Sequence, residues 1–415
     1  MQANLAIDPQ RLWDTLMETA TIGGTAKGGI KRLTLTDEDK KVRDWFKAQC
    51  EALGCTVTVD EVGNMFARRA GRDNALDPIC IGSHLDTQPT GGKFDGVLGV
   101  LAGLEALRTM HALDYVTNAP LELVNWANEE GSRFAPAMLA SGVFAGAFAP
   151  EYAWEREDRA GLRYGDELAR IGYKGAEKAG GHRLGAMFEL HIEQGPILED
   201  EARMIGIVTG VQGMRWYEVN VTGQDAHTGA TPMRLRKNAL LGAARMIDAI
   251  DAIGQRHAPD AVATVGLIEN MPNSRNVIPG EVFFTVDLRH PDEKVLDAME
   301  AEFRAALETV MAPLKLEYAE KCIWKSPAVR FDRRLVDCVR HGAEKCGFAA
   351  REMVSGAGHD AAYIARVAPT TMIFVPCLGG ISHNEAESTT FDECAAGAQV
   401  LLEAVVEWDR RAGGG

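Results

Sequence analysis

The first half of the chain, up to about residue 210, alternates short apolar runs with longer amphipathic stretches. Residues 37–53 have helical spacing, and two apolar runs at residues 56–59 and 78–82 have the length and composition of strands. After Asp95, apolar residues recur three and four positions apart through residues 97–107, which predicts a helix with one buried face. This alternation of helix and strand is typical of an α/β fold.

Three later apolar runs predict strands that are covered on both faces. They show no clean alternation of polar and apolar positions, as expected for parallel strands with helices on either side. Each of them runs directly into polar residues. The runs are residues 121–127, 187–192 and 371–376.

The pattern changes between residues 212 and 326. It predicts the order strand, helix, two strands, helix, strand, which is that of a ferredoxin-like α+β unit. A helix at residues 335–346, stopped by Gly347, then returns the chain to the first pattern. We therefore expect a large domain formed by residues 1–211 and 327–415, interrupted by a smaller domain at 212–326. The expected elements of the smaller domain are residues 216–221, 238–253, 264–267, 282–289, 293–310 and 314–318.

Size, composition and charge narrow the class of protein. The chain has 415 residues, which exceeds the length that a single hydrophobic core usually supports. No apolar run approaches the roughly 20 residues of a membrane helix, and the net charge of -15 disfavours nucleic acid and anionic membranes as partners. Eight cysteines without a CxxC pair predict free thiols. The N-terminus lacks the pattern of a secretory signal, so we expect a cytoplasmic protein.

Polar segments that directly follow buried strands are the first candidates for a functional site. In open α/β sheets, ligands bind outside the carboxyl ends of the strands. Four such segments occur, at residues 82–87, 128–131, 190–195 and 380–385, and Asp95 at the start of a helix makes a fifth. A single histidine after a strand is usually structural, and an adjacent pair of glutamates is usually a solvated surface. The coincidence of all five segments is much rarer and favours a functional site.

The histidines and carboxylates of these segments suit divalent zinc, manganese, cobalt or nickel. In a two-ion site one carboxylate bridges the ions, and Asp95 is the candidate for this role. Asp86 lies on the same side of an extended chain as His84, so we expect its carboxylate to orient that imidazole. Adjacent carboxylates repel each other unless one binds a cation, so we assign Glu130 to a metal ion and Glu129 to general-base catalysis.

Together with four further motifs, these segments resemble a family of dinuclear metal amidohydrolases. The further motifs lie at residues 226–229 (AHTG), 273–279 (NSRNVIP), 287–289 (DLR) and 356–360 (GAGHD). The family comprises N-carbamoyl-L-amino acid hydrolases, β-ureidopropionases and allantoate amidohydrolases, and it is related to the co-catalytic zinc exopeptidases. The resemblance spans nearly the whole chain. It implies an exopeptidase-like α/β catalytic domain with an inserted α+β lid and dimerisation domain.

The resemblance also implies two divalent metal ions per subunit. By position it makes Asp95 the bridging ligand and Glu129 the residue that acts on the water. His191 stands where the exopeptidase relatives typically carry an acidic ligand, which favours the carbamoyl-hydrolysing branch. The implied metal ligands are His84, Asp95, Glu130, His191 and His383.

Five residues are implied in substrate binding. Arg289 would grip the substrate carboxylate, a role that suits the bidentate guanidinium. His227 would polarise the scissile carbonyl, and in relatives this histidine can come from the small domain of the partner subunit, which predicts a homodimer. Gln194, Asn276 and His359 would complete the recognition of the substrate.

We therefore expect hydrolysis of the carbamoyl C–N bond of an N-carbamoyl-L-amino acid, with release of the amino acid, carbon dioxide and ammonia. β-Ureidopropionase and allantoate amidohydrolase activities stay open as alternatives. Three rivals are an exopeptidase or N-acyl amino acid deacylase with the same ions, a cysteine amidase built on Cys377 and His383, and a metal-binding scaffold without activity. No nucleophile elbow surrounds Cys377, and the pair of Glu129 and Glu130 speaks against a scaffold.

Overall fold

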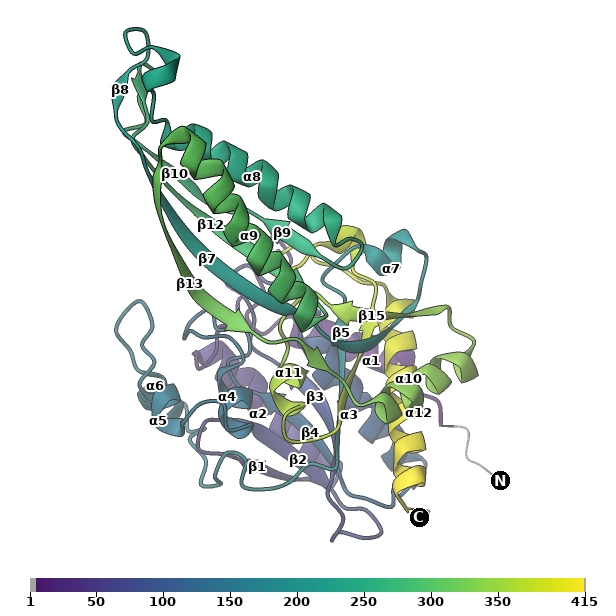
Figure 1. The fold of residues 1–415 in the computed structure, drawn as a ribbon. Helices are drawn as coiled ribbons and strands as arrows, with labels where there is room; N and C mark the ends of the chain where they lie inside the picture. Colours follow the sequence, from purple (N-terminus) through teal and green to yellow (C-terminus); the bar gives the residue numbers. More distant parts are fainter. Residues whose placement is uncertain (1–4, 414–415) are drawn as a thin grey trace. The chain divides into compact units, whose positions relative to one another are not determined.

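The computed structural model describes residues 5–413 and divides into two compact units (Figure 1). The larger unit contains the chain up to Gly210 and again from Arg330 onward. The smaller unit is Val211–Val329, against the expected 212–326. The chain therefore leaves the large unit once, builds the small one, and returns.

A mixed sheet forms the centre of the large unit. Its nine strands within the described chain are β1 (Thr56–Val59), β2 (Met65–Arg69), β3 (Ile79–His84), β4 (Leu121–Trp126), β5 (Ala186–Ile192), β6 (Ile205–Val211), β14 (Val329–Arg330), β15 (Ala350–Ser355) and β16 (Thr370–Val375). In space the order is β1-β2-β4-β3-β5-β16-β6-β14, with β15 beside β6. The four central strands β4, β3, β5 and β16 are parallel, whereas β2 and β6 run antiparallel to their neighbours. The carboxyl ends of the four parallel strands therefore meet at one edge of the sheet.

Helices cover both faces of this sheet, and the α/β prediction is confirmed. Glycines of α3 and α12 lie against β5 on one face, while Phe144 of α4 and Ile364 of α11 belong to a core cluster on the other. No helix in the described part of the chain is long and apolar enough to cross a lipid bilayer. The helices of the large unit are α1 (Pro9–Thr19), α2 (Asp37–Ala52), α3 (Val97–Ala112), α4 (Leu139–Phe144), α5 (Pro150–Trp154), α6 (Tyr164–Arg170), α7 (Ile197–Asp200), α10 (Arg333–Cys346), α11 (Asp360–Ile364), the 3-10 helix η2 (Leu378–Gly380) and α12 (Phe391–Gly413).

Helix α3 lies close to the sheet because glycines occupy the positions that face it. A Cβ atom at Gly99 would collide with the carbonyl oxygen of Leu190, and one at Gly103 would collide with the side chain of Ile81. Asp95 comes just before this helix, and its Oδ1 lies 3.1 Å from Nε2 of His191 on β5. The close packing of α3 on β5 thus brings Asp95 to the end of that strand.

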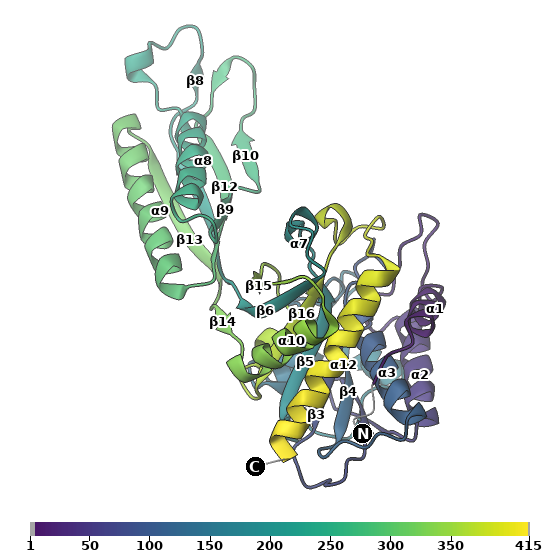
Figure 2. The same ribbon diagram turned by 90° about the vertical axis from the view of Figure 1, so that its right-hand side faces the viewer.

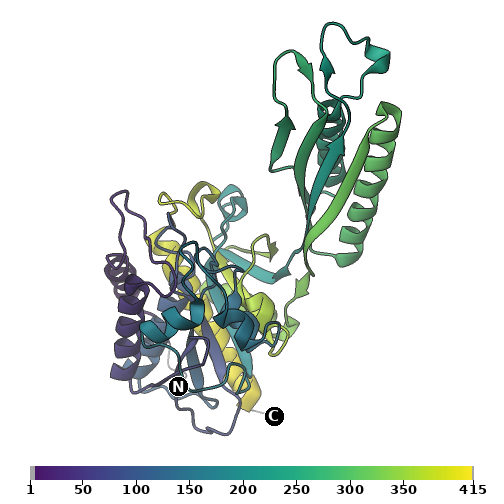
Figure 3. The same ribbon diagram turned by 90° about the vertical axis from the view of Figure 1, so that its left-hand side faces the viewer.

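The small unit is an antiparallel sheet with two helices on one face (Figure 2; Figure 3 shows the opposite side). Its elements are β7 (Gly213–Thr222), α8 (Ala239–Arg256), β9 (Val262–Thr264), β10 (Ile268–Met271), β12 (Glu281–His290), α9 (Glu293–Leu314) and β13 (Glu317–Ser326), with a ribbon of β8 (Ala226–His227) and β11 (Val277–Ile278) and the 3-10 helix η1 (Met233–Leu235). The sheet order is β10-β12-β7-β13, with β9 also pairing with β12. This is the ferredoxin-like arrangement that the sequence predicted.

Two expected elements of the small unit are placed differently. The strand expected at residues 264–267 overlaps β9 only at Thr264 and otherwise falls in the gap between β9 and β10, where Gly266 weakens the extended chain. The strand expected at 314–318 begins only at Glu317, because α9 continues to Leu314. Leu307, Met311 and Leu314 extend the apolar face of that helix into the core, so the helical period persists longer than expected.

Replacing Gly99 with alanine is expected to push α3 away from β5 and to lower the free energy of unfolding by about 1–3 kcal/mol. Urea denaturation in the presence of EDTA measures this without any contribution from bound metal. Gly266→Ala is the control, because an added Cβ atom there meets no heavy atom within 4 Å. Equal unfolding midpoints for Gly99→Ala and the wild type would show that the close approach is dispensable.

Candidate metal centre

The carboxyl ends of the four central strands carry the residues that the sequence singled out. β3 ends at His84, and His191 is the penultimate residue of β5. Glu129 and Glu130 follow β4, and the loop after β16 carries His383. Because β4, β3, β5 and β16 are neighbours in the sheet, these segments arrive at one place.

Asp95 lies at the centre of this group. Its Oδ1 is 3.7 Å from Nε2 of His84 and 3.1 Å from Nε2 of His191, whereas its Oδ2 is 3.5 Å from Nε2 of His383. Nε2 of His383 is in turn 3.6 Å from Oε2 of Glu130. Two trios result, one of His84, Asp95 and His191 and one of Asp95, Glu130 and His383, each with its donor atoms within 4.8 Å of one another. Asp95 belongs to both trios, as a carboxylate that bridged two cations would have to.

The donor atoms of both trios fit divalent cations. Nε2 of His84 and Oε1 of Glu130, one atom from each trio, are buried and have no hydrogen-bond partner among the described residues. Nδ1 of His84 and Nδ1 of His191 each donate to a backbone carbonyl oxygen at 2.9 Å, which leaves Nε2 as the acceptor atom of each ring. Nε2 of His191 also accepts the backbone N–H of Gly96 at 3.1 Å. Imidazole nitrogen and carboxylate oxygen without thiolate suit zinc, manganese, cobalt or nickel.

The carboxylate of Asp86 makes a different contact from the one expected. Its Oδ1 is 3.8 Å from Nδ1 of His84, and the backbone oxygen of Asp86 accepts the imidazole proton instead. The carboxylate accepts the backbone N–H of Glu129 at Oδ1 and that of Glu130 at Oδ2, each at 3.3 Å. Asp86 therefore fixes the backbone that carries the two glutamates, and only its main chain orients His84.

Glu129 and Glu130 are buried among like charges. Oε2 of Glu129 is 3.5 Å from Nε2 of His84. Burial and then the neighbouring carboxylates raise the pKa of both glutamates well above the ordinary range, and burial raises the pKa of Asp86 to about 7. Gln88, which the sequence analysis missed, donates its side-chain amide to Oε2 of Glu130 at 2.5 Å. A cation between these groups would favour their charged forms.

Gln194 and His359, expected to bind substrate, both lie beside the trios. Gln194 adopts a left-handed φ of 58° and donates its amide to Oδ2 of Asp95 at 2.9 Å and to Oγ of Ser382 at 3.0 Å. The buried ring of His359 lies 4.6 Å from the ring of His191, measured between centroids. The structure thus brings both residues to the edge of the sheet that carries the other candidates.

His227 and Asn276 are neighbours on the ribbon at one end of the small unit. β8 pairs with β11, and the N–H of Thr228 donates to the backbone oxygen of Asn276 at 3.1 Å. Nδ1 of His227 accepts two backbone N–H groups, from Gly229 at 3.0 Å and Ala230 at 3.1 Å. In the neutral ring the proton therefore sits on Nε2, which is left to donate outward.

Arg289 lies near the other end of the small unit. It pairs with Met214 of β7 and Val262 of β9, at the end of β12 farthest from the ribbon. Its Nη2 donates to Oδ2 of Asp287 at 2.7 Å and its Nε to Oδ1 of the same carboxylate at 3.0 Å. This ion pair fixes the plane of the guanidinium.

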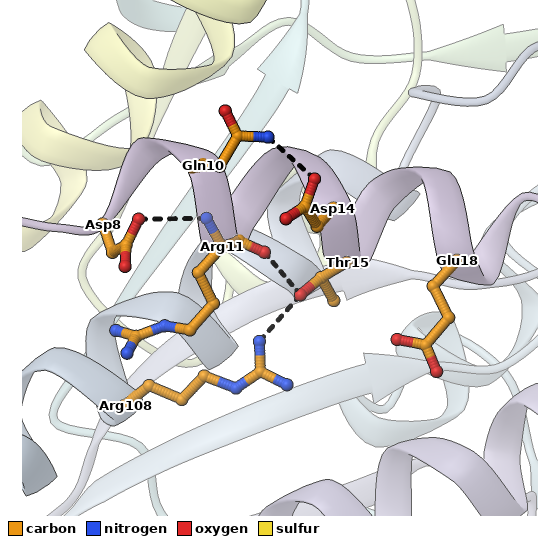
Figure 4. Close-up of a pocket in the computed structure, with 7 residues that line it drawn as sticks. All are labelled: Asp8, Gln10, Arg11, Asp14, Thr15, Glu18 and Arg108. Carbon is orange, nitrogen blue, oxygen red and sulfur yellow. Dashed lines mark hydrogen bonds between the residues drawn. The ribbon is translucent and has the colours of Figure 1, made fainter.

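A polar pocket of about 500 Å³ lies between α1 and α3 and contains none of the candidate residues (Figure 4). Arg108 donates there to Oγ1 of Thr15 and to Oε1 of Gln49, and Arg11 forms an ion pair with Glu105 at 2.7 Å. Both arginines are therefore engaged within the protein. The pocket is lined by Asp8, Gln10, Arg11, Asp14, Thr15, Glu18 and Arg108.

Comparison with known proteins confirms the resemblance that the motifs indicated. Residues 80–407 match peptidase family M20/M25/M40. A Rhizobium meliloti protein named N-carbamoyl-L-amino-acid amidohydrolase is 52% identical over 404 residues, 97% of each chain. The allantoate amidohydrolase of Bacillus subtilis is 35% identical over 92% of this chain and 94% of its own. The crystal structure of a hydantoinase/carbamoylase family amidase from Burkholderia multivorans gives a TM-score of 0.96 at 55% identity, covering 97% of this chain and 98% of that one.

Without metal, the free energy of unfolding is expected to fall as the pH rises from about 4 to 7. The raised pKa values of Asp86, Glu129 and Glu130 mean that the folded chain keeps protons in this range that the unfolded chain has lost. Burial lowers the pKa values of His84 and His359, which act in the opposite sense, but the three carboxyls outnumber the two imidazoles. Bound cations replace those protons, so saturating Zn²⁺ or Mn²⁺ should remove much of the slope.

Urea denaturation at several pH values, with EDTA and with added metal, measures both slopes. Glu130→Gln, which cannot ionise, should flatten the metal-free slope. A slope that is the same with and without metal would contradict the assignment of these carboxylates to a cation site.

Proposed function

The chain belongs to peptidase family M20/M25/M40, and we propose that it hydrolyses the carbamoyl C–N bond of an N-carbamoyl-L-amino acid, releasing the amino acid, carbon dioxide and ammonia. The observation that carries the proposal is the pair of trios that share Asp95, because this arrangement suits two cations acting on one bond. The relative named N-carbamoyl-L-amino-acid amidohydrolase, 52% identical, supports the carbamoyl branch, as does the histidine at position 191.

Each subunit is proposed to hold two divalent ions, zinc or else manganese, cobalt or nickel. His84, His191 and Asp95 would hold one ion, and Asp95, Glu130 and His383 the other. When bound, such ions polarise a carbonyl oxygen and lower the pKa of water. The unpartnered atoms of His84 and Glu130 support one ion in each trio.

Glu129 is the proposed general base. Its buried carboxylate lies beside the first trio without belonging to it, 3.5 Å from His84. The raised pKa, caused by burial and neighbouring carboxylates, suits a group that takes a proton from water and passes it to the leaving nitrogen. Asp86 supports this role because it holds the backbone N–H of Glu129 and so limits where the carboxylate points.

Five residues are proposed to recognise the substrate. Arg289, oriented by its ion pair with Asp287, would bind the substrate carboxylate. His227 would donate its Nε2 proton to the oxygen of the scissile carbonyl, since two backbone N–H groups occupy its Nδ1. The remaining contacts are assigned to Gln194, Asn276 and His359.

The internal geometry of the small unit supports a homodimer. His227 lies on the ribbon beyond the first residue of β12, Glu281, whereas Arg289 lies near the last (Figure 1). The extended strand between residues 281 and 289 spans about 27 Å. An N-carbamoyl amino acid has the length of about two residues of backbone, roughly 7 Å. One substrate therefore cannot touch both residues of the same chain, and both can serve one site only if they come from two subunits.

The small unit also offers an apolar surface for such a dimer. β10 is an edge strand of its sheet, and Ile268 and Met271 on it are 44% and 58% exposed. Leu241 and Ile247 are exposed on α8, which packs beside β9 at the same edge (Figure 2). An unpaired strand edge flanked by exposed apolar side chains supports pairing with a second copy of the chain.

Allantoate amidohydrolase or β-ureidopropionase activity is the alternative. It is supported by the allantoate amidohydrolase of Bacillus subtilis, which is 35% identical to this chain.

A cytoplasmic location of the protein is also part of the proposal. It is supported by the eight cysteines, all free in the structure, as is usual in a reducing compartment.

The purified protein is expected to release ammonia from one member of a panel of N-carbamoyl-L-methionine, N-carbamoyl-β-alanine and allantoate, and to lose this activity with EDTA. Added Mn²⁺ should restore it. Glu129→Gln should lower kcat about 10²- to 10⁴-fold, while Glu151→Gln, an exposed change on α5, should not. Turnover of a dipeptide alone would identify an exopeptidase, and activity that is indifferent to Glu129→Gln would exclude the proposed base.

Two inactive variants are expected to restore activity when they form a mixed dimer. If His227 acts across the dimer, a chain with His227→Asn and a chain with Glu129→Gln together form one complete site per mixed dimer. Random assortment then restores about a quarter of the sites. Coexpression, followed by activity assays on the purified mixture, measures the recovery. No recovery, with mixed dimers demonstrated by differential tags, would place His227 and Glu129 of one site on the same chain.

A further inference from the structure

Glu387 is a buried carboxylate that joins two segments distant in sequence. It lies four positions after His383 and is 4% exposed. Its Oε1 accepts the backbone N–H groups of Phe94 at 3.2 Å and of Asp95 at 3.1 Å. Its Oε2 accepts the hydroxyl of Ser382 at 3.2 Å. One side chain thus holds both the backbone of Asp95 and the residue next to His383.

The segment before Asp95 is shaped around this carboxylate. A Cβ atom at Gly92 would collide with the side chain of Glu387, so only glycine leaves room for it there. Oγ of Ser382 lies 3.2 Å from Oδ2 of Asp95 and 3.2 Å from Oε2 of Glu387. Glu387 therefore contacts the main chain of Asp95 directly and the side chain of Asp95 through the hydroxyl of Ser382.

The ligands of the two trios differ in how they are held. His84 and His191 stand on strands in the middle of the sheet, and a backbone carbonyl fixes each Nδ1. His383 stands on a loop, with a left-handed φ of 56° and a side chain that is 53% exposed. The second trio therefore depends more than the first on contacts that fix its loop.

We propose that Glu387 is a positioning residue that holds Asp95 and His383 in the relative position that the second cation requires. The proposal rests on the proposed two-ion function. Loss of the carboxylate frees the loop of His383 from the backbone of Asp95. The strand positions of His84 and His191, and the 3.1 Å contact of Asp95 with His191, do not involve Glu387. The second ion should therefore weaken much more than the first.

Calorimetric titration of the metal-free full-length protein with Zn²⁺ tests this directly. The wild type is expected to bind two ions per subunit. Glu387→Met, which keeps the size of the side chain and removes its acceptors, should weaken the second ion about 10- to 100-fold and the first less than about threefold. Glu387→Gln keeps an acceptor for the N–H groups of Phe94 and Asp95 and should restore most of the affinity.

The matched control is Glu199→Met. Glu199 also accepts a backbone N–H from the loop after β16, that of Gly379 at 2.6 Å, but at a point away from Asp95. This variant should bind both ions as the wild type does.

The possible outcomes separate this proposal from the function on which it rests. A wild type that binds no ion would overturn the metal centre, and the positioning role with it. Two ions bound equally well by Glu387→Met and the wild type would overturn the positioning role alone. Equal weakening of both ions in Glu387→Met and in Glu387→Gln, with a lower unfolding midpoint in EDTA, would show a general structural role and would also overturn it.

Discussion

Repulsion between buried carboxylates is the constraint on which the large unit depends. Asp86, Asp95, Glu129 and Glu130 are all buried at one edge of the sheet, and an unpaired buried charge costs on the order of several kcal/mol. Hydrogen bonds from backbone N–H groups stabilise the carboxylate of Asp86, and a nearby imidazole stabilises that of Asp95. Bound cations would offset the remaining free-energy cost. The groups that limit the stability of the empty fold are therefore the same groups that equip it for chemistry.

The edge itself could be predicted from the sequence because two simple patterns coincide there. Parallel strands covered on both faces appear as short apolar runs, and the residue types that hold metals appear where those runs stop. His84 and His191 stand at such strand ends, and Glu130 and Asp95 in the turns beside them. The order of the strands in space was not predicted, but any sheet of parallel strands collects its carboxyl ends at one edge. The ferredoxin-like unit was predictable for a similar reason, since its six elements follow one another along the chain.

Side-chain contacts between segments distant in sequence could not be predicted, because they leave no periodic pattern in the sequence. Glu387 follows His383 in a loop, and nothing in its neighbourhood indicates that it reaches the backbone of Asp95, 292 positions away. Gln88 and the carboxylate of Asp86 are similar cases, because periodicity gives the side of a strand but not the atom that a side chain meets. The early end expected for α9 has another cause. Its last apolar residue, Leu314, belongs equally to a helical and to an extended pattern until the core is known.

The small unit carries His227 at one end and Arg289 at the other. With the proposed roles of these two residues, a complete active site requires two chains. Below the dissociation constant of the dimer, the number of complete sites falls with the square of the chain concentration. Specific activity would then decline on dilution although every chain stays folded. A cell that makes little of this protein would obtain disproportionately little turnover from it, and a modest rise in expression would give a steep gain.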